Sequence, residues 1–453
     1  MLFSLTNPEV AIMMMGIFLF AVLLGFPIAF TLMAMGLGFG YYAYFDPTKM
    51  EHLFDNRIFQ LFVQNTYTVM DNNVLTAVPL FLFMGYLVER AGIVAKLFFA
   101  IRLASHKLPA SMAVAALITC TLFSTATGII GAVVTLMGLL AWPAMVKAGY
   151  DKKFASGIIC SGGCLGILIP PSIMLIVYSV IAQLSPLRLF AAAIFPGLML
   201  AGLYIGYAVF RAWLNPSIAP KPAAEEIPPP SVIMREVLVS FLPLFSLIIL
   251  VLGTILAGIA TPAEAAAVGA FGALVLSYFY KTLKWKNFKE SVFLTAKTTA
   301  MIMWLFIGSW TFASVFSYLG GHEVFEHFFK SLDLQPWQFL VITQIIIFLL
   351  GWPLEWTEIL IIFVPIFLPL VEFFGVNPYF FAMLIALNLQ TSFLTPPMAM
   401  SAYYLKGVQS KNVELMQIFS GIMPFLAIVI FAMVLMYIFP GIALWLPDTL
   451  FAE

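Results

Sequence analysis

The chain has 453 residues, of which 63% are hydrophobic and 9% are charged, and its formal net charge at pH 7 is zero. Apolar runs recur from one end to the other, which is more than one aqueous core can bury. The composition therefore excludes an ordinary soluble protein and indicates a chain that spans a bilayer. No nucleic-acid partner is expected.

The first apolar segment, residues 10–44, is too long for one span of about 20 residues. A Gly-Phe-Pro turn at 25–27 divides it into two predicted passes. The polar stretch 46–73 follows, and residues 74–88 form the third predicted pass. Residues 90–107 mix charges with Leu and Phe, which is typical of a helix lying in the membrane interface.

Two irregular segments come next. Residues 108–146 are predicted to enter the membrane and return as a re-entrant hairpin, with small polar residues at its tip, 124–128. Residues 154–182 are predicted to form a broken helix, because glycines and the pair Pro170-Pro171 interrupt its middle. Residues 187–214 form an ordinary pass.

The segment 215–231 is rich in proline and charge, and we interpret it as a cytoplasmic linker between two domains, 1–214 and 232–453. In the second domain, Thr261 and Glu264 have the spacing of a helix N-cap and its first turn. The second domain repeats the order of the first. Its predicted passes are 237–257, 263–280, 298–318 and 413–439, and an amphipathic connection at 281–297 joins the second of them to the third. Between the third and the last pass lie a hairpin at 337–371, which turns at 354–357, and a broken helix at 378–405.

The two halves match at a constant offset of 226 positions. Without any gap, this offset relates Pro143 to Pro369, Gly149 to Gly375, Phe154 to Phe380, Pro170-Pro171 to Pro396-Pro397, Met174 to Met400 and Tyr178 to Tyr404. Two copies of a broken hydrophobic unit, one in each half, are typical of a secondary transporter built from repeats.

The basic residues predict the orientation of the passes. Of the 21 Lys and Arg residues, all but Lys49, Arg57, Arg188 and Lys330 fall in five segments that face the same side if the N-terminus is outside. That side is then the cytoplasm, and both termini are predicted to be periplasmic. The linker lies inside, so the two repeats are predicted to have inverted topology. The five segments are 90–107, 147–153, 211–235, 281–297 and 406–411.

The predicted fold is thus an all-α polytopic membrane protein with about ten transmembrane helices and two re-entrant hairpins. A helix broken at membrane depth frees backbone groups that lipid cannot satisfy, so an ion, water or substrate must satisfy them. Carbonyls and hydroxyls suit sodium, and the amides that follow a break suit an anion. The cation-binding candidates are Ser124, Thr125, Thr127, Gly163, Gly166, Pro170, Thr357, Thr391 and Thr395, and the substrate-binding candidates are Ser172, Asn388, Gln390 and Ser392.

Each candidate hydroxyl has a structural alternative, which is a hydrogen bond to a carbonyl of its own helix. Glu358, at the second hairpin tip, has two interpretations: a carboxylate that couples ion and substrate movement, or a cap of the returning helix. Sodium is the only metal expected, and no cofactor is expected.

An enzymatic function is not expected. The four histidines, His52, His106, His322 and His327, all fall in interfacial or loop segments, so no nucleophile has a base in reach. His322 and His327 are five positions apart, which places them on different faces of a helix and excludes a zinc-protease motif. The three cysteines lie in apolar segments, where they behave as small hydrophobic residues.

Several motifs together resemble one family. They are the passage from Phe123 to Tyr178, the GIATPAEA run at 258–265, the LEWTEI run at 354–359 and the TSFLTPPMAMSA run at 391–402. Over nearly the whole chain, the sequence is similar to the large, DctM-like membrane subunit of tripartite ATP-independent periplasmic (TRAP) transporters. The resemblance implies an elevator-type sodium symporter of the bacterial inner membrane that takes up a small organic acid anion.

The resemblance also implies two partners: a periplasmic substrate-binding protein and a small four-helix, Q-type membrane subunit. This chain starts directly with the first repeat, so a separate small subunit is expected. In this mechanism the hairpins and broken helices move, while residues 10–88 and 188–280 stay in place. A membrane channel and a membrane scaffold without transport remain the alternative functions.

Overall fold

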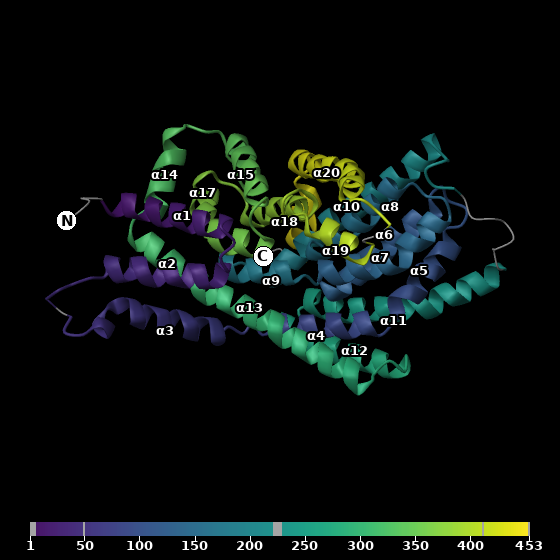
Figure 1. The fold of residues 1–453 in the computed structure, drawn as a ribbon, viewed down its shortest axis with the longest axis horizontal. Coiled ribbons are helices and arrows are strands. Elements are labelled where there is room, and N and C mark those ends of the chain that lie inside the picture. The colour runs from purple at the N-terminus through teal and green to yellow at the C-terminus, as the bar shows by residue number, and fades with distance from the viewer. Residues whose placement is uncertain (1–5, 49, 221–228, 410–411, 452–453) are drawn as a thin grey trace.

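Figure 1 shows the computed structural model, which describes residues 6–48, 50–220, 229–409 and 412–451 and contains only helices within them. The predicted linker 215–231 falls partly outside the described residues. The first half contains α1 (Asn7–Leu23), α2 (Ile28–Ala43), η1 (Leu53–Asp55), α3 (Arg57–Met70), α4 (Ala77–Arg90), α5 (Ile93–Ala104), α6 (Ser111–Thr127), α7 (Ile130–Lys147), α8 (Lys152–Cys164), η2 (Leu165–Ile167), α9 (Ile173–Ala182) and α10 (Pro186–Leu214).

The second half contains a similar series of helices. It contains α11 (Pro230–Leu256), α12 (Pro262–Phe279), α13 (Trp285–Tyr318), α14 (Gly321–Ser331), α15 (Pro336–Leu350), α16 (Trp356–Glu358), the π-helix η4 (Ile359–Phe363), α17 (Val364–Phe373), α18 (Pro378–Leu394), α19 (Met400–Val408), α20 (Leu415–Ile438) and α21 (Gly441–Leu450). The helix starts of α6, α8 and α9 and those of α15, α18 and α19 are separated by close to the 226 positions found in the sequence.

The surface of the protein is that of a membrane protein. Seven helices of the described chain are long and apolar enough to cross a bilayer, and an eighth span results if α4 and α5, bent by 65° at their junction, count as one. Six shorter apolar helices accompany them. Large side chains such as Phe20, Phe271 and Phe293 are more than half exposed, because the surrounding medium is hydrocarbon.

The helices form two groups that lie side by side in Figure 1. The first group, here called the frame, comprises α1–α5 and α11–α14, in which α13 packs along α2 and α4, and α12 packs along α4. The second group, here called the bundle, comprises α6–α10 and α15–α21, in which α8 packs on α20 and α18 on both α15 and α20. The predicted hairpins and broken helices all lie in the bundle.

Three features differ from the sequence-based expectations. The predicted amphipathic connection 281–297 is largely continuous with the next pass, because α13 runs unbroken for 34 residues from Trp285 to Tyr318. The polar stretch 46–73 contains the helix α3, and α14 and α21 were not predicted either. Residues 188–214 of α10, expected to stay in place with the frame, pack instead on α6, α18 and α20 of the bundle.

Local capping signals are confirmed. The backbone N–H of Thr261 donates to the Glu264 carboxylate over 2.8 Å, and the Thr261 hydroxyl accepts from the Glu264 backbone N–H over 3.3 Å. This capping box begins α12 as its spacing predicts. The predicted turn at 25–27 likewise separates α1 from α2.

Candidate functional site

The first predicted hairpin tip lies where α6 ends at Thr127 and α7 begins at Ile130. Gly128 has a φ of 62°, in the left-handed region that glycine adopts without steric cost. The hydroxyls of Ser124, Thr125 and Thr127 donate to carbonyls four residues back, over 2.5, 2.6 and 3.0 Å. Each oxygen keeps lone pairs that are free to accept, so these bonds are compatible with cation coordination.

The second tip lies between Leu350 and Trp356, where the sequence predicts it. Thr357 and Glu358 are buried there, 2% and 5% exposed. Oε2 of Glu358 has no hydrogen-bond partner among the described residues. The returning arm then passes through the π-helix η4, a feature often found at functional sites.

Both predicted helix breaks are present. The first separates α8 and η2 from α9, and Ser172 caps α9 by accepting from Leu175 N while its hydroxyl donates to Ile167 O over 2.5 Å. The second separates α18, which ends at Leu394, from α19, which begins at Met400. The Pro-Pro bond within each break is cis.

Each hairpin approaches its own broken helix at a glycine. A Cβ atom on Gly166 would lie 2.4 Å from Cβ of Ser124, and a Cβ atom on Gly351 would lie 2.7 Å from Cβ of Ser392. Ser392 occupies the position that the 226 offset assigns to Gly166. The offset takes Ser124 to Leu350, the neighbour of Gly351, so the two contacts lie at nearly equivalent places. The glycine is on the broken helix in the first half and on the hairpin in the second. Gly163 also packs closely, against Val134 of α7.

The two tips meet at one cavity of about 150 Å³, here called the central cavity. It is bounded by frame residues of α4 and α13, by both tips and by residues next to both breaks. The lining residues are Leu82, Tyr86, Gly128, Ile129, Ile130, Gly131, Ile167, Ile173, Thr298, Met301, Ile302, Glu355, Trp356, Thr357, Phe393, Met400 and Tyr404.

The polar groups of the central cavity come from both helix groups. Across the frame, the hydroxyls of Tyr86 and Thr298 are hydrogen bonded over 3.1 Å. The bundle contributes Glu355, Thr357 and Tyr404. Thr357 is the one predicted site residue in this lining. Tyr86, Thr298 and Tyr404 were not predicted, because nothing in their local sequence shows that α4, α13 and α19 converge.

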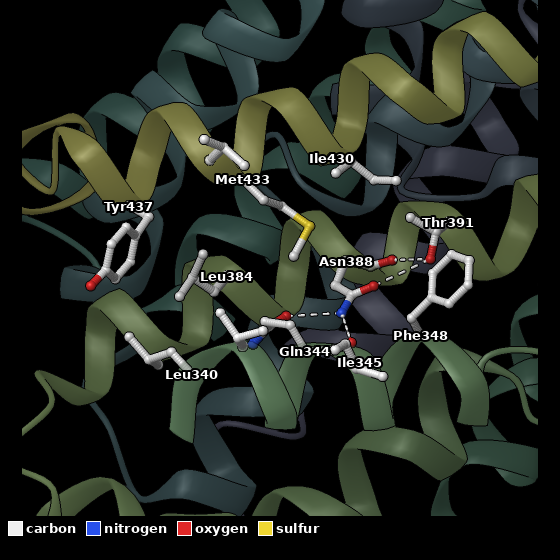
Figure 2. Close-up of a pocket in the computed structure, with 12 residues that line it drawn as sticks. Leu340, Gln344, Ile345, Phe348, Leu384, Asn388, Thr391, Ile430, Met433 and Tyr437 are labelled. Carbon is white, nitrogen blue, oxygen red and sulfur yellow. Dashed lines mark hydrogen bonds between the residues drawn. The ribbon is translucent and has the colours of Figure 1, made fainter. Parts of the chain in front are cut away.

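The predicted substrate residue Asn388 lies elsewhere, in a separate pocket of about 380 Å³ between α15, α18 and α20 (Figure 2). Its Nδ2 donates to the backbone oxygen and to Oε1 of Gln344, over 2.7 and 2.9 Å. Thr391 donates to the backbone oxygen of Asn388 over 2.7 Å. The rest of the pocket lining is apolar, so this polar group crosses between α15 and α18 on an otherwise hydrophobic wall (Figure 2).

The remaining predicted residues are buried within the bundle. Ser392 and Thr395 donate to carbonyls of their own helix, at Leu389 over 2.7 Å and Thr391 over 2.9 Å. Gln390 is fully buried, and neither of its amide atoms has a partner among the described residues. Such an amide at membrane depth is costly unless water or a ligand satisfies it. Pro170 lies in the first break.

No group of three or more His, Cys, Asp or Glu residues in the described part of the chain is arranged to hold a metal ion. The predicted cation-binding residues offer carbonyl and hydroxyl oxygens, which are ligands that sodium accepts in broken-helix transporters. Cys120, Cys160 and Cys164 are fully buried and not in disulfides.

Comparison with known proteins identifies relatives over most of the chain. Residues 15–442 match the family model of the tripartite ATP-independent periplasmic transporter, DctM component. The C4-dicarboxylate TRAP transporter large permease DctM of Pseudomonas aeruginosa is 29% identical over 85% of this chain and 88% of that protein. The sialic acid large permease SiaM of Vibrio cholerae is also 29% identical, over 84% of this chain and 87% of its own length.

A third relative is longer. The isethionate TRAP transporter permease DctMQ of Oleidesulfovibrio alaskensis is 29% identical over 84% of this chain, which covers 59% of that protein. Among solved structures, the YdaH transporter of Alcanivorax borkumensis superposes with a TM-score of 0.62 at 15% identity, covering 95% of this chain and 98% of its own. MtrF of Neisseria gonorrhoeae gives a TM-score of 0.55 at 14% identity, covering 98% and 95%. These two likenesses establish a shared transporter fold.

Proposed function

Because the chain belongs to the DctM component family of TRAP transporters, whose members are large membrane subunits, we propose that it couples sodium entry to the uptake of a small organic acid anion. Family membership makes it a multi-pass transport protein of the inner membrane and not an enzyme. The direction, coupling ion and substrate class form the proposal.

The observation that carries the proposal is the convergence of both hairpin tips on the central cavity. Each tip brings hydroxyls and carbonyls next to a helix break, at Gly166 in the first half and Ser392 in the second. Two such places, related by the repeat and adjoining one cavity, support two sodium sites that flank one substrate site. The candidate ligands are those predicted from the sequence, with Ser124 and Thr395 foremost.

The charge of the central cavity favours a coupled cation. Among its lining residues there is no Lys or Arg, and Glu355 carries the only carboxylate. An anion taken out of water needs opposite charge or hydrogen-bond donors close by. Sodium ions bound beside the cavity supply that charge, and they explain how an anion can enter a site without basic side chains.

The substrate class rests on the relatives. Their names describe permeases for C4-dicarboxylate, sialic acid and isethionate, all of which are organic acids. We assign an organic acid anion to this chain, delivered by a periplasmic binding protein. The second partner is a separate small Q-type membrane subunit, which we place on the frame.

The proposed movement is an elevator motion in which the bundle slides past the frame. The contacts that must change lie around the central cavity, where α4 and α13 face the two tips. One is the hydrogen bond from Ser309 of α13 to the carbonyl of Ile361 in η4, over 3.2 Å. A two-state displacement of one rigid group against another is a known mode of alternating access.

The test is uptake by proteoliposomes that contain this chain, the small subunit and the binding protein loaded with its ligand. We expect uptake that requires an inward sodium gradient, saturates with substrate and increases with an inside-negative potential. Equal uptake driven by a proton gradient in sodium-free buffer would contradict sodium coupling. Uptake that does not saturate would indicate a channel, and no uptake under any gradient would indicate a scaffold.

A further inference from the structure

A second chemically distinct site lies on the frame, away from the central cavity. Where the C-terminus of α4 packs against the N-terminal part of α13, six residues enclose a pocket of about 540 Å³. Here called the basic pocket, it is lined by Arg90, Lys286, Lys289, Glu290, Phe293 and Leu294. It joins the two halves of the chain, because α4 belongs to the first half and α13 to the second.

The basic pocket carries an excess of positive charge. Its only acidic lining residue, Glu290, accepts a hydrogen bond from Nη1 of Arg90 over 3.1 Å. Lys286 and Lys289 remain as additional cations, three positions apart on α13 and therefore on one face of the helix. Nε of Arg90 is buried and has no hydrogen-bond partner among the described residues. The pocket thus offers charge and at least one unused donor to an anion.

Its surroundings place the basic pocket at the membrane surface. Trp285, next to Lys286, is 75% exposed, and Phe293 in the lining is 63% exposed. The ammonium group of Lys289 lies 5.7 Å from the ring centroid of Phe293, close enough for a cation–π interaction. Exposed aromatic residues beside lysines mark the level of lipid headgroups. The α4–α13 junction also belongs to the segments that the charge pattern assigns to the cytoplasmic side.

We propose that the basic pocket binds the phosphate of an anionic phospholipid of the phosphatidylglycerol or cardiolipin type. Arg90, Lys286 and Lys289 contact the phosphate, while Phe293 and Leu294 contact the glycerol and the upper part of an acyl chain. An anionic lipid fits better than a soluble anion because apolar and basic groups line the same pocket. Because the lipid contacts both α4 and α13, it stabilises the packing between the two halves of the frame.

The test measures which lipids stay bound to the purified complex of the full chain with its small subunit. The complex is equilibrated with equal amounts of phosphatidylglycerol and phosphatidylethanolamine, and retained lipids are counted by native mass spectrometry. The wild type is expected to retain phosphatidylglycerol preferentially. Lys286→Gln with Lys289→Gln is expected to reduce that preference roughly 30-fold, since each cation near a headgroup contributes about 1 kcal/mol.

The matched control is Lys147→Gln with Lys153→Gln, which removes the same charge from exposed positions outside the basic pocket. We expect this control to keep the wild-type preference. Lys289→Gln alone is expected to reduce the lipid preference by an intermediate amount. This single variant replaces the double variant in the test if the melting temperature shows that the double variant folds poorly. An unchanged preference in the double variant, or an equal loss in the control, overturns the proposal. Displacement of the lipid by millimolar inorganic phosphate overturns it too, in favour of a soluble anion.

Discussion

At the level of single residues, the absence of a Cβ atom at two glycines allows each hairpin to approach its broken helix closely. Gly166 and Gly351 lie where a side chain would overlap Ser124 and Ser392, and the internal repeat places the two contacts within one position of each other. The hydroxyls of Ser124, Thr125, Ser392 and Thr395 donate to carbonyls of their own helices. At the second tip, the Thr357 hydroxyl and Oε2 of Glu358 have no partner among the described residues. Close approach and free lone pairs together make these places suited to a small cation.

Gly166→Ala and Gly351→Ala are each expected to destabilise the protein by about 1–3 kcal/mol, because the new methyl group overlaps a neighbouring Cβ atom. Thermal unfolding of the purified chain measures the loss, and uptake should fall in parallel. Gly202→Ala is the control, since its Cβ would meet nothing within 4 Å on α10. Equal melting temperatures for all three variants would refute the packing argument.

Ser124→Ala and Thr395→Ala are expected to raise the sodium concentration needed for half-maximal uptake by about tenfold, the effect of losing roughly one charge-assisted contact of ~1.4 kcal/mol. Neither change opens a large cavity, so the melting temperature should move little. Thr254→Ala removes a hydroxyl with a similar bond to its own helix, but at a partly exposed place on α11 away from the tips, and should leave sodium dependence unchanged. A uniform loss of uptake at every sodium concentration would favour a purely structural role.

At the level of the elements, the first hairpin tip lies directly against α4. A Cβ atom on Gly85 would lie 2.7 Å from the backbone oxygen and 2.9 Å from Cα of Thr127. The second tip has its own link to the frame through Ser309 and the π-helix η4. The frame therefore contacts both hairpins, and the proposed movement of the bundle would have to break these contacts.

A disulfide between Gly85→Cys and Thr127→Cys is expected to stop uptake, and a reductant should restore it, because the bond would fix the tip to α4. The two backbones are in contact here, but a Cβ atom at position 85 would overlap the backbone of Thr127, so formation of the bond is verified first by a free-thiol assay. The matched control pairs Gly36→Cys with Thr311→Cys, which are in contact between α2 and α13 within the frame. Oxidation of this pair should leave uptake intact. If the first disulfide forms and uptake continues, the bundle does not move past α4.

For the whole molecule, the sequence predicts that the two halves are oriented oppositely in the membrane. From the hairpins onward, the helices of the two halves follow a similar order, and α7 lies at the place of the arm formed by α16, η4 and α17. If the repeats are inverted, the C-terminal ends of these two arms lie on opposite sides. The basic segments support this orientation.

Lys147→Cys, at the end of α7, and Glu372→Cys, near the end of α17, test the inversion because both positions are exposed. In intact spheroplasts, a membrane-impermeant thiol reagent should label the cysteine at 372 and spare the one at 147. In inside-out vesicles the pattern should reverse. The parent chain is a suitable background because its three cysteines are buried. Labelling of both positions from the same side would rule out inverted repeats.

The sequence by itself determined the medium, the internal repeat and several local features. The bilayer as medium follows from composition, and the breaks at 170–171 and 396–397 follow from prolines that cannot continue a helix. The cap at Thr261 and the tip at Gly128 follow from the chemistry of neighbouring residues. The internal repeat, with its constant offset of 226 positions, was found by comparing the sequences of the two halves.

Only the tertiary structure decided which residues meet. It brought Tyr86, Thr298 and Tyr404 to the central cavity and joined Asn388 to Gln344, 44 positions away. It also extended α13 through a charged segment, because packing along α2 and α4 stabilises a helix that local polarity would end. Backbone conformation depends on near neighbours, whereas a binding site depends on contacts between distant segments, and these exist only once the helices have packed.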